Sequence, residues 1–201
     1  MEAIFTLPYS EYEVINQLKK RLNKSEFSFY VPTSRQEKGA DFILHNSESN
    51  KHLRFQVKSS RAFADEPKIS EKQKRYYKHN LWFNNFIEKC RKDNADYYIL
   101  FGLYPVYQQG KNIKSKLAFW KEIIMCFSKE EMISLLKNAK TVREKKKERF
   151  FGFGFDIDNE IYCTRAFTGL KNDKEQDLKL VEMFSRVLIK DKLEELKEKL
   201  K

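Results

Sequence analysis

GADFILHNSESNKHLRFQVKSSR, residues 39–61, is the segment on which the predicted fold depends. An apolar segment, a polar turn and an alternating segment follow one another within it, which predicts a β-hairpin. In the return strand Leu53, Phe55 and Val57 alternate with polar residues. Side chains two apart share a face of a strand, so we expect one apolar and one polar face.

The polar face of this hairpin gathers side chains that can do chemistry. Gln56 and Lys58 are two residues apart and therefore point to the same side. A turn centred near Ser49 would place Asp41 beside Val57 and Lys58. A carboxylate, an amide and an ammonium at one end of a sheet indicate a site rather than packing.

The first predicted helix adds a further acid to this group. Residues 9–22 predict an amphipathic helix with Ser10 as its N-cap. Its apolar stripe consists of Val14, Ile15, Leu18 and Leu22. Glu11 falls near the middle of that stripe, where a carboxylate needs a partner or a metal. Either Glu11 belongs to the site, or it lies at an exposed helix start and serves only the helix dipole.

The remaining segments predict an α/β protein. The near-continuous apolar run 95–104 is typical of a central strand that is covered on both faces. The other expected elements are strands at 27–31 and 120–127, helices at 80–94 and from Ser128, a hairpin turning at Asp158-Asn159, and a helical tail from 173 to 201 with a break near Lys190-Asp191. An aromatic strand at 76–83 is the alternative to the start of the 80–94 helix. We expect a core over residues 1–127 and an extension of helix, hairpin and helix, 128–201, packed on the same domain.

The overall composition indicates a globular protein with an anionic partner. The chain has 201 residues, 41% of them hydrophobic, and a net charge of +11. Such an excess favours nucleic acid as the partner, although a solvated lysine-rich surface would also produce it. The densest basic run, 137–149, either neutralises phosphates or forms a solvated helix end.

Two further patterns narrow the class of protein. Three scattered cysteines and three histidines without zinc spacing predict neither a disulfide framework nor a zinc site. The acidic N-terminus is unlike a signal peptide, and no apolar run is long enough to span a bilayer. We therefore expect a soluble, cytoplasmic protein.

The order of elements and the hairpin motif together resemble a known family. Asp41 stands at the start of the second strand, and Gln56-Val57-Lys58 on the third, in a helix–strand–strand–strand–helix–strand series. This arrangement resembles the PD-(D/E)XK nuclease superfamily over residues 9–105. The resemblance implies a restriction endonuclease-like αβββαβ core, with a central mixed sheet flanked by helices, to which the C-terminal β-hairpin and helices are additions.

Two positions depart from the superfamily pattern. Ala40 precedes Asp41 where a proline is usual, and Gln56 stands at the acidic position. This QxK form is similar to that of modification-dependent restriction endonucleases. The resemblance therefore implies a Mg²⁺-dependent endonuclease that hydrolyses DNA phosphodiester bonds in restriction or defence.

The resemblance also implies roles for five residues. Asp41, Glu11, Gln56 and the Val57 carbonyl would hold Mg²⁺, or Mn²⁺ in its place. Lys58 would orient the attacking water or stabilise charge on the phosphate. Since Gln56 offers one neutral oxygen, metal affinity would depend more on Asp41 and Glu11.

Other functions remain open at this point. The same fold serves repair and junction-resolving nucleases, and it can lose catalysis and keep nucleic-acid binding. Asp41, Gln56 and Lys58 could also form only a hydrogen-bonded surface cluster. Double-stranded DNA is the expected partner, with RNA as the alternative, and symmetric double-strand cleavage would favour a homodimer.

Overall fold

The computed structural model describes residues 8–32, 39–61, 77, 79–107, 118–143, 146–155, 160–167 and 178–201. In chain order the elements are α1 (Tyr9–Lys19), β1 (Phe27–Tyr30), β2 (Phe42–Asn46), β3 (His52–Arg61), β4 (His79–Asn84), α2 (Ile87–Lys92), β5 (Tyr97–Tyr107), β6 (Ala118–Ser128), α3 (Lys129–Asn138), β7 (Val142–Arg143), β8 (Lys146–Lys147), β9 (Phe150–Phe155), β10 (Ile161–Cys163), α4 (Leu180–Met183) and α5 (Ile189–Leu200). The predicted hairpin is confirmed as β2 and β3.

A mixed five-stranded sheet organises the molecule, with strand order β1-β2-β3-β5-β6. Strands β3 and β5 run parallel, and the other neighbouring pairs run antiparallel. A parallel pair needs a crossover between its strands, and β4 and α2 lie in that connection. The prediction of an α/β protein with a central mixed sheet is therefore confirmed.

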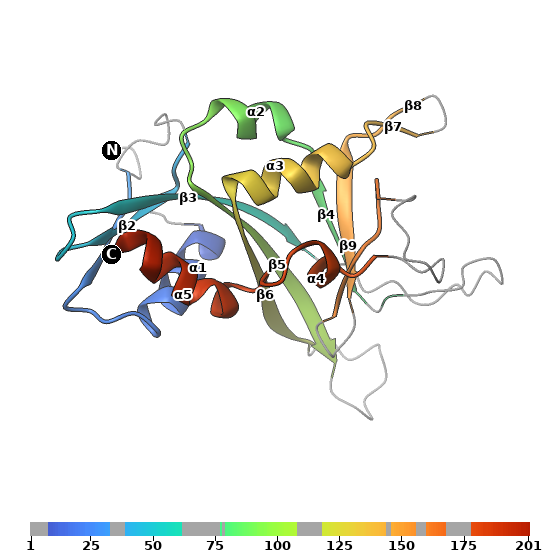
Figure 1. The fold of residues 1–201 in the computed structure, drawn as a ribbon. Helices are drawn as coiled ribbons and strands as arrows, with labels where there is room; N and C mark the ends of the chain where they lie inside the picture. Colours follow the sequence, from blue (N-terminus) through green and yellow to red (C-terminus); the bar gives the residue numbers. More distant parts are fainter. Residues whose placement is uncertain are drawn as a thin grey trace, which may run out of the picture.

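Helices cover both faces of this sheet, with α1 and α5 on one side and α2 and α3 on the other (Figure 1). The alternation along β5 shows both contacts. Tyr97, Ile99 and Phe101 belong to the buried cluster that contains residues of α1 and α5. Tyr98 and Leu100 belong to the cluster that contains residues of α2 and α3. This is why the run has no polar face, as the sequence predicted.

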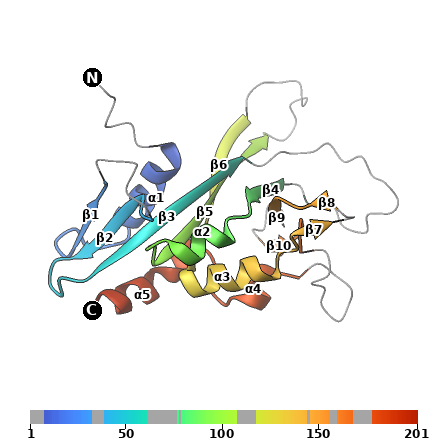
Figure 2. The same cartoon turned by 90° about the horizontal axis from the view of Figure 1, so that it is seen from above.

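A second sheet, of order β10-β9-β4, lies beside the first, at the end away from β1 (Figure 2). The helix predicted over 80–94 is wrong in its first half, because β4 pairs along the whole of β9. The alternation confirms the strand: Phe83 is buried while Trp82 is 44% exposed. The helical part is α2 alone.

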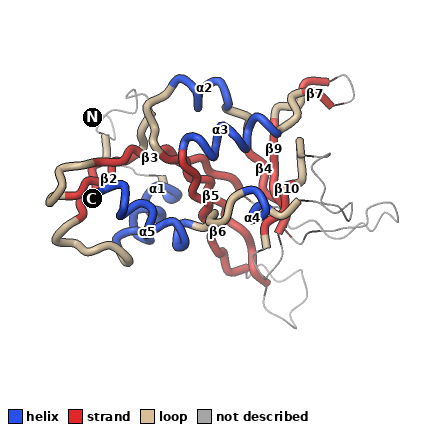
Figure 3. The backbone as a smooth tube through the Cα atoms, viewed as in Figure 1, coloured by secondary structure: helices blue, strands red, loops and turns tan. Residues whose placement is uncertain are grey.

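The first helix and the C-terminal helices begin or end at other residues than predicted. The apolar stripe of α1 is buried as expected, but Pro8 rather than Ser10 occupies the N-cap. The tail is not one helix, because α4 ends at Met183 and α5 begins at Ile189 (Figure 3). The chain is extended at Leu188, which forms a β-bridge with Met125, so the break precedes the predicted Lys190-Asp191.

The C-terminal elements share their core with the central sheet. The cluster on the α2 and α3 side contains Tyr98 and Phe127 together with Met132 and Phe153. The expected boundary between residues 127 and 128 stays a prediction. Strands β9 and β10 form the predicted hairpin, and its expected turn at Asp158-Asn159 lies outside the described residues. Among the described helices, none has the length and apolar character needed to cross a membrane.

Candidate functional site

Asp41 is held at the end of the β2–β3 ladder by two hydrogen bonds. Its backbone N–H donates to the Phe55 carbonyl at 2.7 Å, and its Oδ2 accepts from the Val57 N–H at 2.6 Å. Phe42 pairs with Phe55, so the register places Asp41 opposite Gln56 rather than beside Val57 and Lys58. The predicted register was wrong by one residue, because the turn is centred between Glu48 and Ser49 rather than on Ser49. The carboxylate nevertheless reaches Val57.

The backbone conformation of Gly39 positions Asp41 at the start of β2. Its φ of +99° lies in the region that favours glycine. A Cβ atom there would lie 2.7 Å from the Asn94 backbone nitrogen. The segment before β2 therefore packs closely against the chain that follows α2. The sequence signal for this contact was the glycine itself, two residues before the acid.

Gln56 and Lys58 lie on the face of β3 opposite its apolar residues, as predicted. Phe55 and Val57 are buried, while Gln56 and Lys58 are half-buried. The Lys58 Nζ lies 5.7 Å from the centroid of the Phe86 ring. An ammonium beside a ring face gains a cation–π attraction, so Lys58 has a defined place near the start of α2.

Burial makes Lys58 easier to deprotonate than an ordinary lysine. Desolvation is the main cause of its lowered pKa, and the positive charge of Lys89 adds to the effect. The carboxylates of Asp41, Asp93 and Glu11 act in the opposite direction without cancelling it. Lys58 therefore lies within the electrostatic reach of both predicted site acids.

Glu11 lies in the first turn of α1 and is half-buried. Helix α1 covers the face of the central sheet that carries Phe55 and Val57, so it lies on the side opposite Gln56 and Lys58, although the charge of Glu11 still acts on Lys58. The site role remains a prediction, since the helix begins at Tyr9 and Glu11 also suits the helix dipole.

The oxygen atoms around Asp41 are of the kind that Mg²⁺ prefers. In the described part of the chain, no three His, Cys, Asp or Glu side chains form a metal-binding group. Neutral oxygens would therefore have to complete a site with Asp41. The Val57 N–H points to Asp41, and its carbonyl shares that edge of the strand. Asp41 Oδ1, the Val57 carbonyl oxygen and the Gln56 amide oxygen are all donors of the kind that Mg²⁺ binds.

Sequence reasoning missed the groove that opens beside Lys58. It has a volume of about 840 Å³ and lies between β3, the β4–α2 segment and the β8–β9 segment. Its lining includes Lys58, Trp82, Phe86, Lys89, Lys147, Arg149 and Phe150. Two of these belong to the basic run 137–149, so part of that run faces the same groove as Lys58. The interleaved aromatic and basic residues were visible in the sequence, but their meeting depends on the β4–β9 pairing.

Comparison of the chain with protein-family models, with curated proteins and with solved structures finds no match in any of the three.

Proposed function

We propose that this protein is a metal-dependent endonuclease of the restriction endonuclease-like fold that cleaves DNA in restriction or defence. The observation that carries the proposal is the hydrogen bond from the Val57 N–H to Asp41, with Lys58 directly following on the same strand. It joins an acid at a strand start to the strand that carries the Gln56-x-Lys58 motif.

The topology supports this assignment. The series α1, β1, β2, β3, α2, β5 follows the αβββαβ order of the PD-(D/E)XK resemblance. Strand β4 interrupts the series, but it belongs to the second sheet and leaves the central order intact. Strands β6, β9 and β10 and helices α3 to α5 are then additions to this core.

The residues of the site would have different roles in hydrolysis. Asp41, the Val57 carbonyl and Gln56 would hold Mg²⁺, with Glu11 of α1 as a further acid. The bound metal would polarise the scissile phosphate and acidify a water molecule. Lys58 places a positive charge where negative charge develops on the phosphate. Its lowered pKa also lets it exchange a proton with water more readily than an exposed lysine.

Plasmid cleavage with Mg²⁺ tests this proposal. Asp41→Asn keeps an oxygen that can accept the Val57 N–H, so it should fold and lose activity by about 100-fold or more. Lys58→Met should lose a similar factor. Lys51→Met is the charge-matched control on the exposed hairpin turn and should cleave as the wild type does. Equal cleavage by all four proteins, or none by the wild type, would contradict the proposal.

Two features of the site favour a second function, a nucleic-acid-binding module of the same fold. Gln56 brings no charge to the site, and no cluster of three acidic, histidine or cysteine ligands occurs within the described residues. Salt-sensitive binding of DNA by the wild type, with no cleavage in Mg²⁺ or Mn²⁺, would select this function.

A further inference from the structure

We propose that the groove beside Lys58 binds unpaired nucleotides of a nucleic-acid strand, with bases stacked on Trp82 and Phe150. This inference names the substrate class of the site described above, and it rests on the proposed function for a phosphate near Lys58. The stacking surface itself is argued independently, from β4 and β9.

The pairing of β4 with β9 forms the stacking surface. Trp82 lies opposite Gly152, and Asn84 lies opposite Phe150. A Cβ atom on Gly152 would lie 2.6 Å from Trp82 Cδ1, so the glycine lets the indole pack against the β9 backbone. Trp82 and Phe150 remain 44% and 38% exposed, respectively. Two large aromatic side chains thus stay open to solvent on one sheet face, beside a groove.

Arg165 holds the two rings in place. Its guanidinium carbon lies 4.9 Å from the Trp82 ring and 5.0 Å from the Phe150 ring. The same guanidinium forms an ion pair with Glu148 at 3.2 Å. If Arg165 packed on the two rings only to stabilise the sheet, its own position would be explained. The exposed area that Trp82 and Phe150 keep would not be. Restrained aromatic rings are well suited to stacking, because they lose little entropy on binding.

The charge of the groove is suited to a phosphate backbone. Its basic lining residues are Lys58, Lys89, Lys147 and Arg149. Its two acids are already ion-paired with arginines: Glu88 with Arg91 at 3.0 Å and Glu148 with Arg165 at 3.2 Å. The groove therefore presents positive charge next to aromatic rings, which is the combination that binds single strands.

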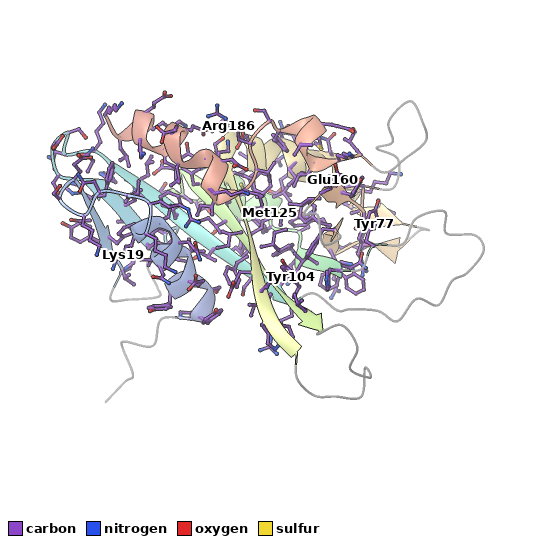
Figure 4. All side chains as sticks on the ribbon, turned by 90° about the horizontal axis from the view of Figure 1, so that it is seen from below. Lys19, Tyr77, Tyr104, Met125, Glu160 and Arg186 are labelled. Carbon is purple, nitrogen blue, oxygen red and sulfur yellow. The ribbon has the colours of Figure 1, made fainter. Side chains whose placement is uncertain are left out.

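Stacking on a protein ring requires a base face that is not covered by a neighbouring base. In a duplex these faces are occupied, so Trp82 and Phe150 favour unpaired or extruded bases. The same sheet carries a second aromatic pair, Tyr77 and Tyr162, with ring centroids 5.0 Å apart. Tyr77 lies at the end of the molecule opposite Lys19 of α1 (Figure 4) and is buried, so this second pair packs against the sheet, whereas Trp82 and Phe150 stay open to solvent.

Tryptophan fluorescence can report on this surface directly, because the chain contains two tryptophans. Trp120→Phe leaves Trp82 as the only reporter, and Trp82→Phe leaves Trp120, which is exposed on β6. Each variant is titrated in EDTA with single-stranded oligodeoxythymidylate and with a duplex of equal length. We expect the single strand to quench Trp82 but not Trp120, and the duplex to quench Trp82 less at equal concentration.

Affinity measured by anisotropy of a labelled strand provides the second test. Trp82→Ala should weaken single-strand binding by about 5- to 150-fold, whereas Trp120→Ala should leave it unchanged. Circular dichroism and the urea midpoint show whether Trp82→Ala is folded, and Phe150→Ala provides an independent variant with the same expected direction.

Three results would overturn the inference: no binding of the strand, binding without a change in Trp82 emission, or tighter binding of the duplex. Binding with Trp82 quenching by a protein that does not cleave plasmid DNA would remove the catalytic proposal and support this one.

Discussion

Lys192→Met removes the centre of a buried ionic cluster that joins α5 to α3 and β5. Lys192 is 2% exposed, and its Nζ contacts Glu131 Oε1 and Oε2 at 2.7 and 2.8 Å. It also contacts Glu195 Oε2 at 2.8 Å, while Glu195 Oε1 accepts from the Tyr97 hydroxyl at 2.8 Å. Methionine fills a similar volume but leaves two carboxylates facing each other.

The expected cost follows from this geometry. Removing one partner of a buried ion pair costs about 3–5 kcal/mol. Glu131 and Glu195 keep 26% and 30% side-chain exposure, so water can hydrate them in part. We therefore expect the lower end, about 3 kcal/mol, or a Tm lower by about 6–12 °C.

Urea unfolding followed by circular dichroism measures this loss. Lys190→Met, an exposed lysine on the same helix, is the matched control and should change stability by less than about 0.5 kcal/mol. Adding Glu195→Gln to Lys192→Met should recover part of the loss, because one of the two uncompensated charges is removed. A Lys192→Met protein within about 1 kcal/mol of the wild type would show that the two carboxylates do not need the Lys192 charge.

Three further predictions concern stability, and urea midpoints check each of them. Gly39→Ala should cost about 1–3 kcal/mol, because its positive φ and the nearby Asn94 backbone leave no room for a Cβ; an unchanged midpoint would contradict this. Burial alone would raise the pKa of Glu195, but hydrogen bonds from Lys192 and Tyr97 hold it below its ordinary value. Wild-type stability should therefore fall as the pH drops below about 4.3, and fall less in Lys192→Met. Burial lowers the pKa of Lys58, so its charged form opposes folding at neutral pH. Lys58→Met should thus be at least as stable as the wild type at pH 7, with the difference shrinking as the pH rises towards about 10.

Local patterns were sufficient to predict much of the central sheet. The alternation of Leu53, Phe55 and Val57 predicted the buried face of β3, and the unbroken run of β5 predicted a strand covered on both sides. The helix predicted from Ser128 is present as α3, and Ser128 and Glu131 form a capping box at its start. These features depend on residues close in sequence or on a simple period.

The errors arose where distant segments decide the structure. Trp82, Phe83 and Phe86 fit a helical spacing, but pairing with β9, more than sixty residues later, makes the first two part of a strand. Leu188 lies within the predicted helical tail, but its bridge to Met125 extends the chain there. Such pairings override local preference, because each satisfies backbone hydrogen bonds at a buried position.

In the site, too, local features were predicted and features that depend on distant segments were not. The shared face of Gln56 and Lys58 followed from the period of a strand, whereas the register of Asp41 depended on the turn and was misjudged. The groove beside Lys58 combines residues from β3, β4, α2 and the β8–β9 segment. Periodicity in the sequence cannot show which distant segments lie side by side, so the groove could not be predicted from it.

A crystal structure of the protein with Mn²⁺ and a DNA strand tests the central claim most directly. We expect an anomalous peak about 2.1 Å from Asp41 Oδ1 and the Val57 carbonyl oxygen, with Lys58 facing the nearest phosphate. The peak should be absent in Asp41→Asn. A metal bound elsewhere, or DNA bound away from Lys58, would show that Asp41 and Lys58 do not form the proposed catalytic site.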